Sequence, residues 1–334
     1  MKIHTHQGKW LALITSTFLL ILCMLGSVLL GYTDTSIQTA VQAFSHPTGV
    51  FDQLVVTEVR LPRALIGAAI GGALAVAGAL MQALTRNPMA SPDFIGVNAG
   101  ASFFIVAAMM LFSVTSLEAF LWIGLIGSAV TSLAVYLLGS MGSGGLSPLK
   151  ITLAGAATAM LFASMTQGLL VLDESALDQV MFWLAGSIEG RKLELLQLVI
   201  PYLTVGFLIA LFLGKSINVL QMGEDVATGL GQKTWLVKLL GLVSIVLLAG
   251  SAVSVAGPIS FIGVMVPHIA KGLVGHDYRW LVPFSITIGG IVLVLADISA
   301  RFVMMPEEVP VGVMTALIGI PFFLAVARRG VGKA

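Results

Sequence analysis

Charge is scarce in this sequence of 334 residues. Asp, Glu, Lys and Arg together make up 10% of it, while 57% of the residues are hydrophobic and the mean hydropathy is +1.02. Soluble domains carry roughly 25% charged residues, so these values exclude an ordinary soluble enzyme and predict an integral membrane protein. Long polar intervals are also lacking, since the longest, residues 32–60, is too short for a folded domain. We therefore expect one transmembrane domain over residues 1–334, with no separate catalytic domain.

Cysteine and catalytic motifs are equally sparse. The single cysteine, Cys23, lies inside the first apolar run, which excludes a disulfide framework. His4 and His6 have no further ligand nearby, and HExxH, CxxC and GxSxG motifs are absent. The net charge is +1 and the basic residues are dispersed, which predicts no nucleic-acid partner. The sequence therefore predicts no catalytic residues and no metal site.

Apolar runs of about 20 residues, the length of a membrane-spanning helix, recur along the whole chain. The first follows Lys2 and Lys9, is longer than the apolar region of a signal peptide, and is expected to be retained as a span. Ten helices are predicted, over residues 10–31, 61–84, 94–112, 117–138, 149–171, 193–213, 235–256, 258–273, 280–302 and 311–327. The fold class is thus an all-α, polytopic membrane bundle.

The distribution of basic residues predicts the orientation. With the N-terminus inside, twelve of the seventeen Lys and Arg residues face the cytoplasm, as the positive-inside rule expects. Both termini are then cytoplasmic. The short eighth run is counted as a span because omitting it would move the basic C-terminal tail outside. Five cations remain outside: Arg60, Arg63, Arg191, Lys192 and Arg301.

Titratable groups away from the ends of these runs are few: His268, Asp297 and Arg301. Asp297 and Arg301 are four residues apart, so they share a helix face and are expected to form an ion pair. A structural pair and a proton relay both remain open for Asp297. So sparse a set is a weak basis for ion-driven transport, and energy for uphill transport would then come from a partner protein.

The segment between the sixth and seventh predicted helices, residues 217–231, is the candidate contact for such a partner. It is cytoplasmic in the predicted orientation and contains Gly223, Gly229 and Gly231 as turn points. A plain polar loop is the alternative that the pattern leaves open.

Several motifs together resemble the FecCD family, the permeases of vitamin B12, haem and iron-siderophore ABC importers. The matching segments follow the family's order from about residue 58 onward, and the family's ten-helix topology agrees with the count above. They are RLPR (60–63), GALMQALTRNPMASPDFIGVNAGA (78–101), GPISFIGVMVPHIAK (257–271), ADISAR (296–301) and VPVGVMTALIGIPFFL (309–324).

The resemblance implies a role for three of the external arginines. In this family, arginines of the RLPR and ADxxAR segments receive acidic residues of a substrate-binding protein, which assigns binding-protein docking to Arg60, Arg63 and Arg301. A guanidinium offers a fork of donors to a carboxylate, which fixes orientation and steers encounter. The alternative for Arg60 and Arg63 is that they only anchor a helix end at the membrane surface.

The resemblance also implies the cytoplasmic sites. Residues 217–231 resemble the coupling helices that insert into the ATPase subunit, and the turn at 85–92, together with the loop around Ser147, resembles the inner gate. The expected coupling residues are Gly223, Glu224, Ala227, Leu230 and Gly231. The expected gate residues are Asn87, Met89 and Ser147.

The protein is thus expected to be the permease subunit of a type II ABC importer in the bacterial cytoplasmic membrane. The implied partners are a second permease, identical or not, two ABC ATPases and an external substrate-binding protein. ATP would be bound by the ATPases, so no cofactor is expected here. Ferric siderophore is the expected cargo, with haem and cobalamin open. An ion-coupled carrier using His268 and Asp297, and a passive channel, are the alternatives from other classes.

Overall fold

The computed structural model describes residues 3, 5–31, 35–45, 49–141, 148–171 and 177–331, and every regular element in these residues is a helix. A helix occupies each of the ten predicted positions. They are α1 (His6–Leu29), α4 (Leu61–Thr85), α5 (Val97–Phe112), α6 (Leu117–Ser140), α7 (Pro148–Leu170), α9 (Leu193–Gln221), α11 (Thr234–Ala256), α12 (Ile262–Val274), α13 (Tyr278–Val303) and α14 (Val311–Val331).

Within the described residues, seven helices are long and apolar enough to cross a membrane: α1, the continuous helix Phe51–Thr85, α6, α7, α9, α11 and α13. Three shorter apolar helices, α5, α12 and α14, stand at the other three predicted positions. The chain is therefore a multi-pass membrane protein.

Shorter helices lie between or next to the ten predicted spans, one of them in the segment 217–231 that resembles coupling helices. They are α2 (Ile37–Ser45), α3 (Phe51–Leu54), η1 (Val55–Arg60), η2 (Pro92–Ile95), α8 (Leu177–Leu184) and α10 (Glu224–Gly229). The π-helical turn η1 joins α3 to α4, so helix runs without a break from Phe51 to Thr85, starting well before the predicted residue 61. Such π turns inside helices are frequent at functional sites.

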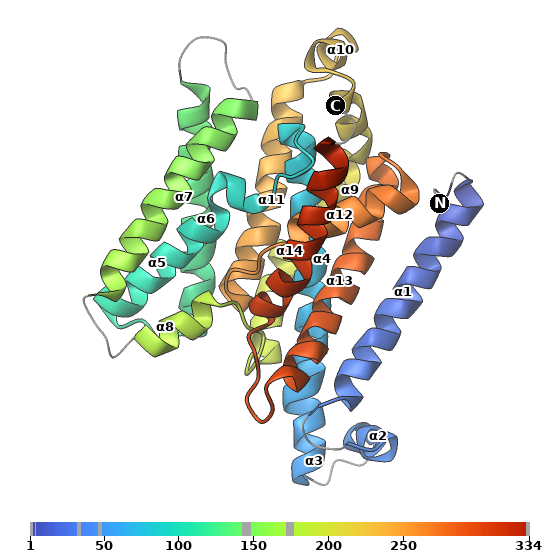
Figure 1. Ribbon diagram of the computed structural model, residues 1–334, viewed down its shortest axis with the longest axis vertical. Coiled ribbons are helices and arrows are strands. Elements are labelled where there is room, and N and C mark those ends of the chain that lie inside the picture. The colour runs from blue at the N-terminus through green and yellow to red at the C-terminus, as the bar shows by residue number, and fades with distance from the viewer. Residues whose placement is uncertain are drawn as a thin grey trace.

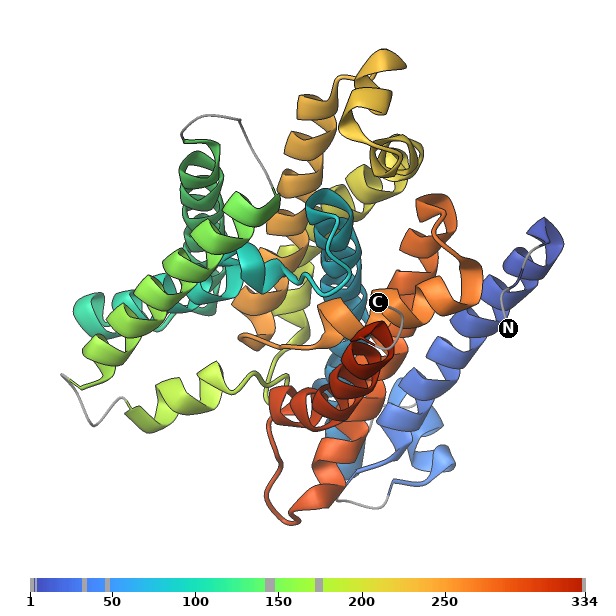
Figure 2. The same cartoon turned by 45° about the horizontal axis from the view of Figure 1, so that its top comes forward.

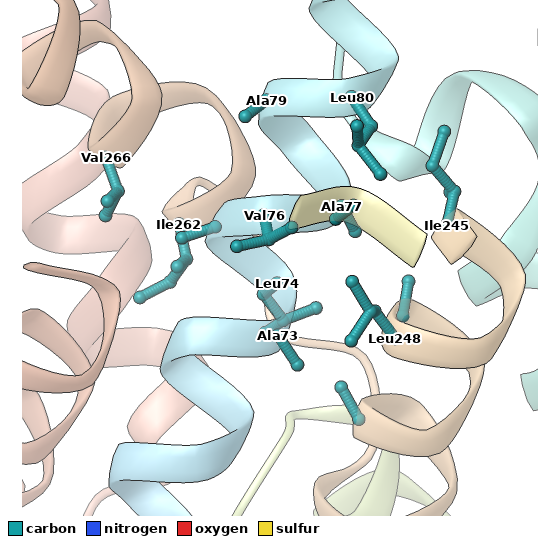
Figure 3. Packing of buried hydrophobic residues seen from close by; sticks show 14 of the residues in the cluster. Ala73, Leu74, Val76, Ala77, Ala79, Leu80, Ile245, Leu248, Ile262 and Val266 are labelled. Atoms are coloured by element: carbon teal, nitrogen blue, oxygen red, sulfur yellow. The ribbon is translucent and has the colours of Figure 1, made fainter. Parts of the chain in front are cut away.

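Helix α4 lies at the centre of the bundle and is buried along most of its length. It packs against α11, α12 and α13, and Figure 3 shows Ile245 and Leu248 on one side of it and Ile262 on the other. Glycine permits the closest approach: a Cβ at Gly78 would lie only 1.9 Å from the carbonyl oxygen of Gly263. Small residues at helix crossings allow this contact where water cannot drive association.

The two ends of the bundle carry different features (Figure 1). Helix α10 lies at one end, called here the α10 end, together with the end of α14 and the start of α13. Helices α2 and α3 and the connection from α13 to α14 lie at the opposite end, called here the α2 end. Figure 2 shows the same separation with the α10 end turned forward.

Candidate functional site

The three arginines predicted to dock a partner are buried at the α2 end. Arg60 is 4% exposed, Arg63 is 5% exposed and Arg301 is 3% exposed. Arg60 ends η1, Arg63 lies in the first turn of α4, and Arg301 lies in the last turn of α13. None of these three guanidiniums is therefore open to a partner in this conformation, because each side chain is buried in the protein.

Asp297 joins two of these arginines. Its side chain is buried, its Oδ1 accepts a hydrogen bond from Arg63 Nη2 at 2.8 Å, and its Oδ2 accepts one from Arg301 Nη2. The second contact is the i,i+4 ion pair expected from the spacing. Arg63 Nη1 also lies 2.6 Å from Glu308 Oε2, in the connection before α14. We call this group the arginine network; it comprises Arg60, Arg63, Asp297, Arg301 and Glu308. The network ties α4 and α13 to the connection before α14.

The arginine network also holds the end of α1. Arg60 Nη1 donates to the carbonyl oxygens of Val28 and Leu29, and Arg301 Nη1 donates to those of Ser27 and Leu30, at 2.7 to 3.2 Å. The last four carbonyls of a helix lack partners within it and carry the negative end of its dipole. Two arginines therefore cap α1, which otherwise has few buried residues.

Two other cations at the α2 end keep access to solvent. Lys192 is exposed and Arg191 is partly exposed, both in the connection between α8 and α9. In the same connection, burial and the negative charge of Glu308 raise the pKa of Glu189, against the effect of Arg63. Burial lowers the pKa of Arg191. This connection is therefore electrostatically coupled to the arginine network.

The candidate coupling segment lies at the α10 end. Helix α9 continues to Gln221, eight residues past its predicted end at 213, and α10 follows after a short turn. Gly223 has a φ of 132° and Gly231 a φ of 81°, values that residues with a side chain rarely adopt. The two glycines thus bracket α10 as turn points, as the sequence predicts, whereas Gly229 is part of the helix.

The other predicted coupling residues differ in their exposure to solvent. Glu224 is exposed and pairs with Lys238 of α11 at 2.6 Å, and Leu230 is 67% exposed. Ala227 differs from the prediction: it is fully buried within its own chain, so it has no surface to offer a partner. Its methyl group seats α10 in the core of the protein.

The predicted gate turn follows directly from α4. Arg86, with a left-handed φ of 50°, ends the helix, and Asn87 Oδ1 accepts a hydrogen bond from Met89 N at 3.0 Å. Arg86 Nη2 donates to the carbonyl of Leu220 at 3.1 Å, and Gln221 Nε2 donates to that of Ala83 at 2.6 Å. The end of α9, next to α10, is thus bonded to the end of α4, next to the gate turn.

Two further predictions concern Ser147 and His268. Ser147 lies outside the described residues. His268 is partly buried in α12, with its ring centroid 5.8 Å from that of Phe322. Among the described residues, no group of three or more His, Cys, Asp or Glu could hold a metal ion. Asp297 is paired with two arginines, and His268 packs against an aromatic ring, so each has a structural partner.

Comparison with known proteins agrees with the motifs. The FecCD transport family matches residues 19–329. A siderophore transport system permease protein, YfiZ of Bacillus subtilis, is 53% identical over 324 residues, 97% of each chain. The ferric enterobactin transport system permease protein FepD of Escherichia coli is 42% identical over 311 residues, 93% of each chain.

A solved structure described as an inward-facing conformation of a metal-chelate type ABC transporter is also similar. It has a TM-score of 0.82 and 28% identity, and the match covers 95% of this chain and 98% of that chain. The helical bundle and the sequence relatives therefore point to one family. This chain belongs to the FecCD transport family.

Proposed function

We propose that this protein is the permease subunit of an ABC importer in the bacterial cytoplasmic membrane, and that it translocates a ferric siderophore. The near full-length identity to permeases named for siderophore and ferric enterobactin transport carries the proposal. These names favour iron chelates over haem and cobalamin. The whole chain would act as one transmembrane unit, assembled with a second permease that is identical or related.

Separate ATPase subunits would supply the energy and bind the ATP, so this chain would need no cofactor of its own. Helix α10 supports this division of labour, because Gly223 and Gly231 set it apart as a short projecting unit with Leu230 exposed. A projecting helix with an exposed apolar residue is suited to insertion into a groove on a partner. In this proposal α10, seated by Ala227, is the contact for one ATPase.

Movement of α10 would reach the gate turn through hydrogen bonds. Leu220 and Gln221 lie within three residues of Gly223. The carbonyl of Leu220 and the side chain of Gln221 are hydrogen-bonded to the end of α4. Asn87 and Met89 follow that end directly. ATP-driven movement of the ATPases would thereby bias the turn between two states, as coupling between distant sites requires.

Docking of an external binding protein is proposed for the α2 end, at Arg60, Arg63 and Arg301. Because these guanidiniums are buried and bonded within the chain, a partner carboxylate reaching Arg60 or Arg301 has to displace carbonyls of α1. Arg191 and Lys192, which keep solvent access, would attract the acidic partner first. Docking would then be accompanied by local rearrangement of the arginine network.

Uptake into proteoliposomes tests the proposal. The assembled permease, ATPases and binding protein should accumulate radioactive ferric siderophore only with ATP, and an uncoupler should leave uptake intact while ATP is held constant. The permease alone should not accumulate it. Accumulation by the permease alone, driven by an ion gradient, would support the carrier alternative and refute the importer. Competition by unlabelled haem or cobalamin would reassign the cargo.

A further inference from the structure

A hollow of about 630 Å³ opens at the α10 end, between the ends of α4, α9 and α12 and the start of α13. Its lining includes Gln82, Arg86, Asn218, Lys271 and Asp277. Pockets for small ligands commonly measure about 300 to 1,000 Å³, so a small molecule or a lipid headgroup fits. The hollow adjoins the gate turn, and Asn218 and Gln221 of the coupling segment line one side of it.

Two cations of the hollow have no carboxylate partner in the described part of the chain. Lys271 Nζ donates to Gln82 Oε1 at 2.7 Å, and Arg86 Nη2 donates to the carbonyl of Leu220 at 3.1 Å. Both partners are neutral oxygens, so they orient the cations without cancelling the charges. An ammonium has three donors and a guanidinium has five, which leaves donors for a ligand.

The carboxylate of the hollow is already balanced. Asp277 accepts a hydrogen bond from Asn218 Nδ2 at 2.6 Å and pairs with Arg279 Nη2 at 2.7 Å. The hydrogen bond from Arg279 is the main cause of its low pKa, about 2, so the group stays ionised near neutral pH. Because Arg279 offsets Asp277, Arg86 and Lys271 give the hollow a positive charge.

Neighbouring aromatic residues indicate the depth of the hollow in the membrane. Trp280, in the first turn of α13 and three residues from Asp277, packs against Trp10 with ring centroids 5.2 Å apart. Lys9 Nζ lies 5.9 Å from the Trp280 ring, and Trp10 is 59% exposed. Tryptophan and lysine gather where lipid headgroups meet the hydrocarbon. The start of α13, which borders the hollow, therefore lies at headgroup level.

We propose that this hollow binds the phosphate group of an anionic ligand, with an anionic phospholipid headgroup as its source. Arg86 and Lys271 approach the phosphate from α4 and α12 and donate charge-assisted hydrogen bonds to its oxygens. Occupancy joins the ends of these two helices beside the gate turn. The site is independent of the cargo and of the docking proposed for the α2 end.

Lipid binding to the purified full chain tests this site. Native mass spectrometry of protein loaded with equal phosphatidylglycerol and phosphatidylcholine should show preferential retention of phosphatidylglycerol. The double variant Arg86→Gln/Lys271→Gln should lose this preference by about tenfold or more, since each cation near the headgroups contributes on the order of a fewfold. Lys215→Gln, at an exposed lysine near the end of α9, is the matched control and should keep it.

Two further measurements identify the source of the phosphate group and test the role of the positive charge. Displacement of the lipid by millimolar inorganic phosphate would support the site and identify free phosphate as its ligand. The charge-conserving Lys271→Arg should retain the preference, which would show that the positive charge at this position carries it, and a far-UV circular dichroism spectrum equal to wild type should show that the double variant is folded. An unchanged preference in the double variant overturns the proposal. The proposal is also overturned if the double variant no longer copurifies with the ATPase but still binds the lipid, because the two cations would then serve a protein contact.

Discussion

Replacing Asp297 with asparagine removes the central negative charge of the arginine network while preserving the shape of the side chain. Asp297 is 1% exposed and bonds to two buried arginines, one through each oxygen. Removing one partner of a buried ion pair costs about 3–5 kcal/mol, because the remaining charge is left uncompensated. Arg63 keeps Glu308 and Arg301 keeps the carbonyls of α1, so we expect the lower limit, about 3 kcal/mol.

The free energy of unfolding can be measured by SDS titration in mixed micelles, followed by tryptophan fluorescence. Glu58→Gln is the matched control, because Glu58 is an exposed carboxylate of η1 at the same end, and should change stability by less than about 0.5 kcal/mol. In a double-mutant cycle with Arg63→Gln, the two changes should be non-additive by about 0.5–3 kcal/mol. A loss in Asp297→Asn no larger than that of the control would refute the structural role of the buried charge.

Three other changes test the α1 cap, the α4 crossing and the α10 turn. Arg60→Gln should speed amide hydrogen exchange at the end of α1, because two carbonyl bonds are lost; exchange equal to wild type would contradict the cap. Gly78→Val should destabilise the bundle by about 1–3 kcal/mol in SDS titration, because the new Cβ meets the backbone of Gly263. The control Gly229→Ala should be tolerated, because the space around Gly229 is open. Gly223→Ala should strain its left-handed backbone by about 1–3 kcal/mol and lower ATP-coupled uptake more than it lowers the yield of folded protein. Equal effects of Gly223→Ala and Gly229→Ala would show that the turn is not a special point.

Features that depend on neighbouring residues can be predicted from the sequence alone. Apolar run length places the ten helices, because a helix in hydrocarbon satisfies its own backbone and needs only local length and composition. The contact of Asp297 with Arg301 follows from one turn of helix. Gly223 and Gly231 were identifiable as turn points because only glycine adopts such φ values without strain. Family motifs then carried the assignment to FecCD permeases.

The directions of the charged side chains depend instead on how distant helices pack together. The sequence shows that Arg60 and Arg301 are cations at helix ends, but their carbonyl partners in α1 lie 31 to 274 positions away. Every residue has a backbone carbonyl, so such a partner leaves no mark in the sequence. The burial of Ala227 and the hollow formed by Arg86 and Lys271 likewise depend on how separate helices pack. Local pattern therefore determines the helices, whereas long-range packing buries the arginines predicted to dock a partner and uses two of them to cap α1.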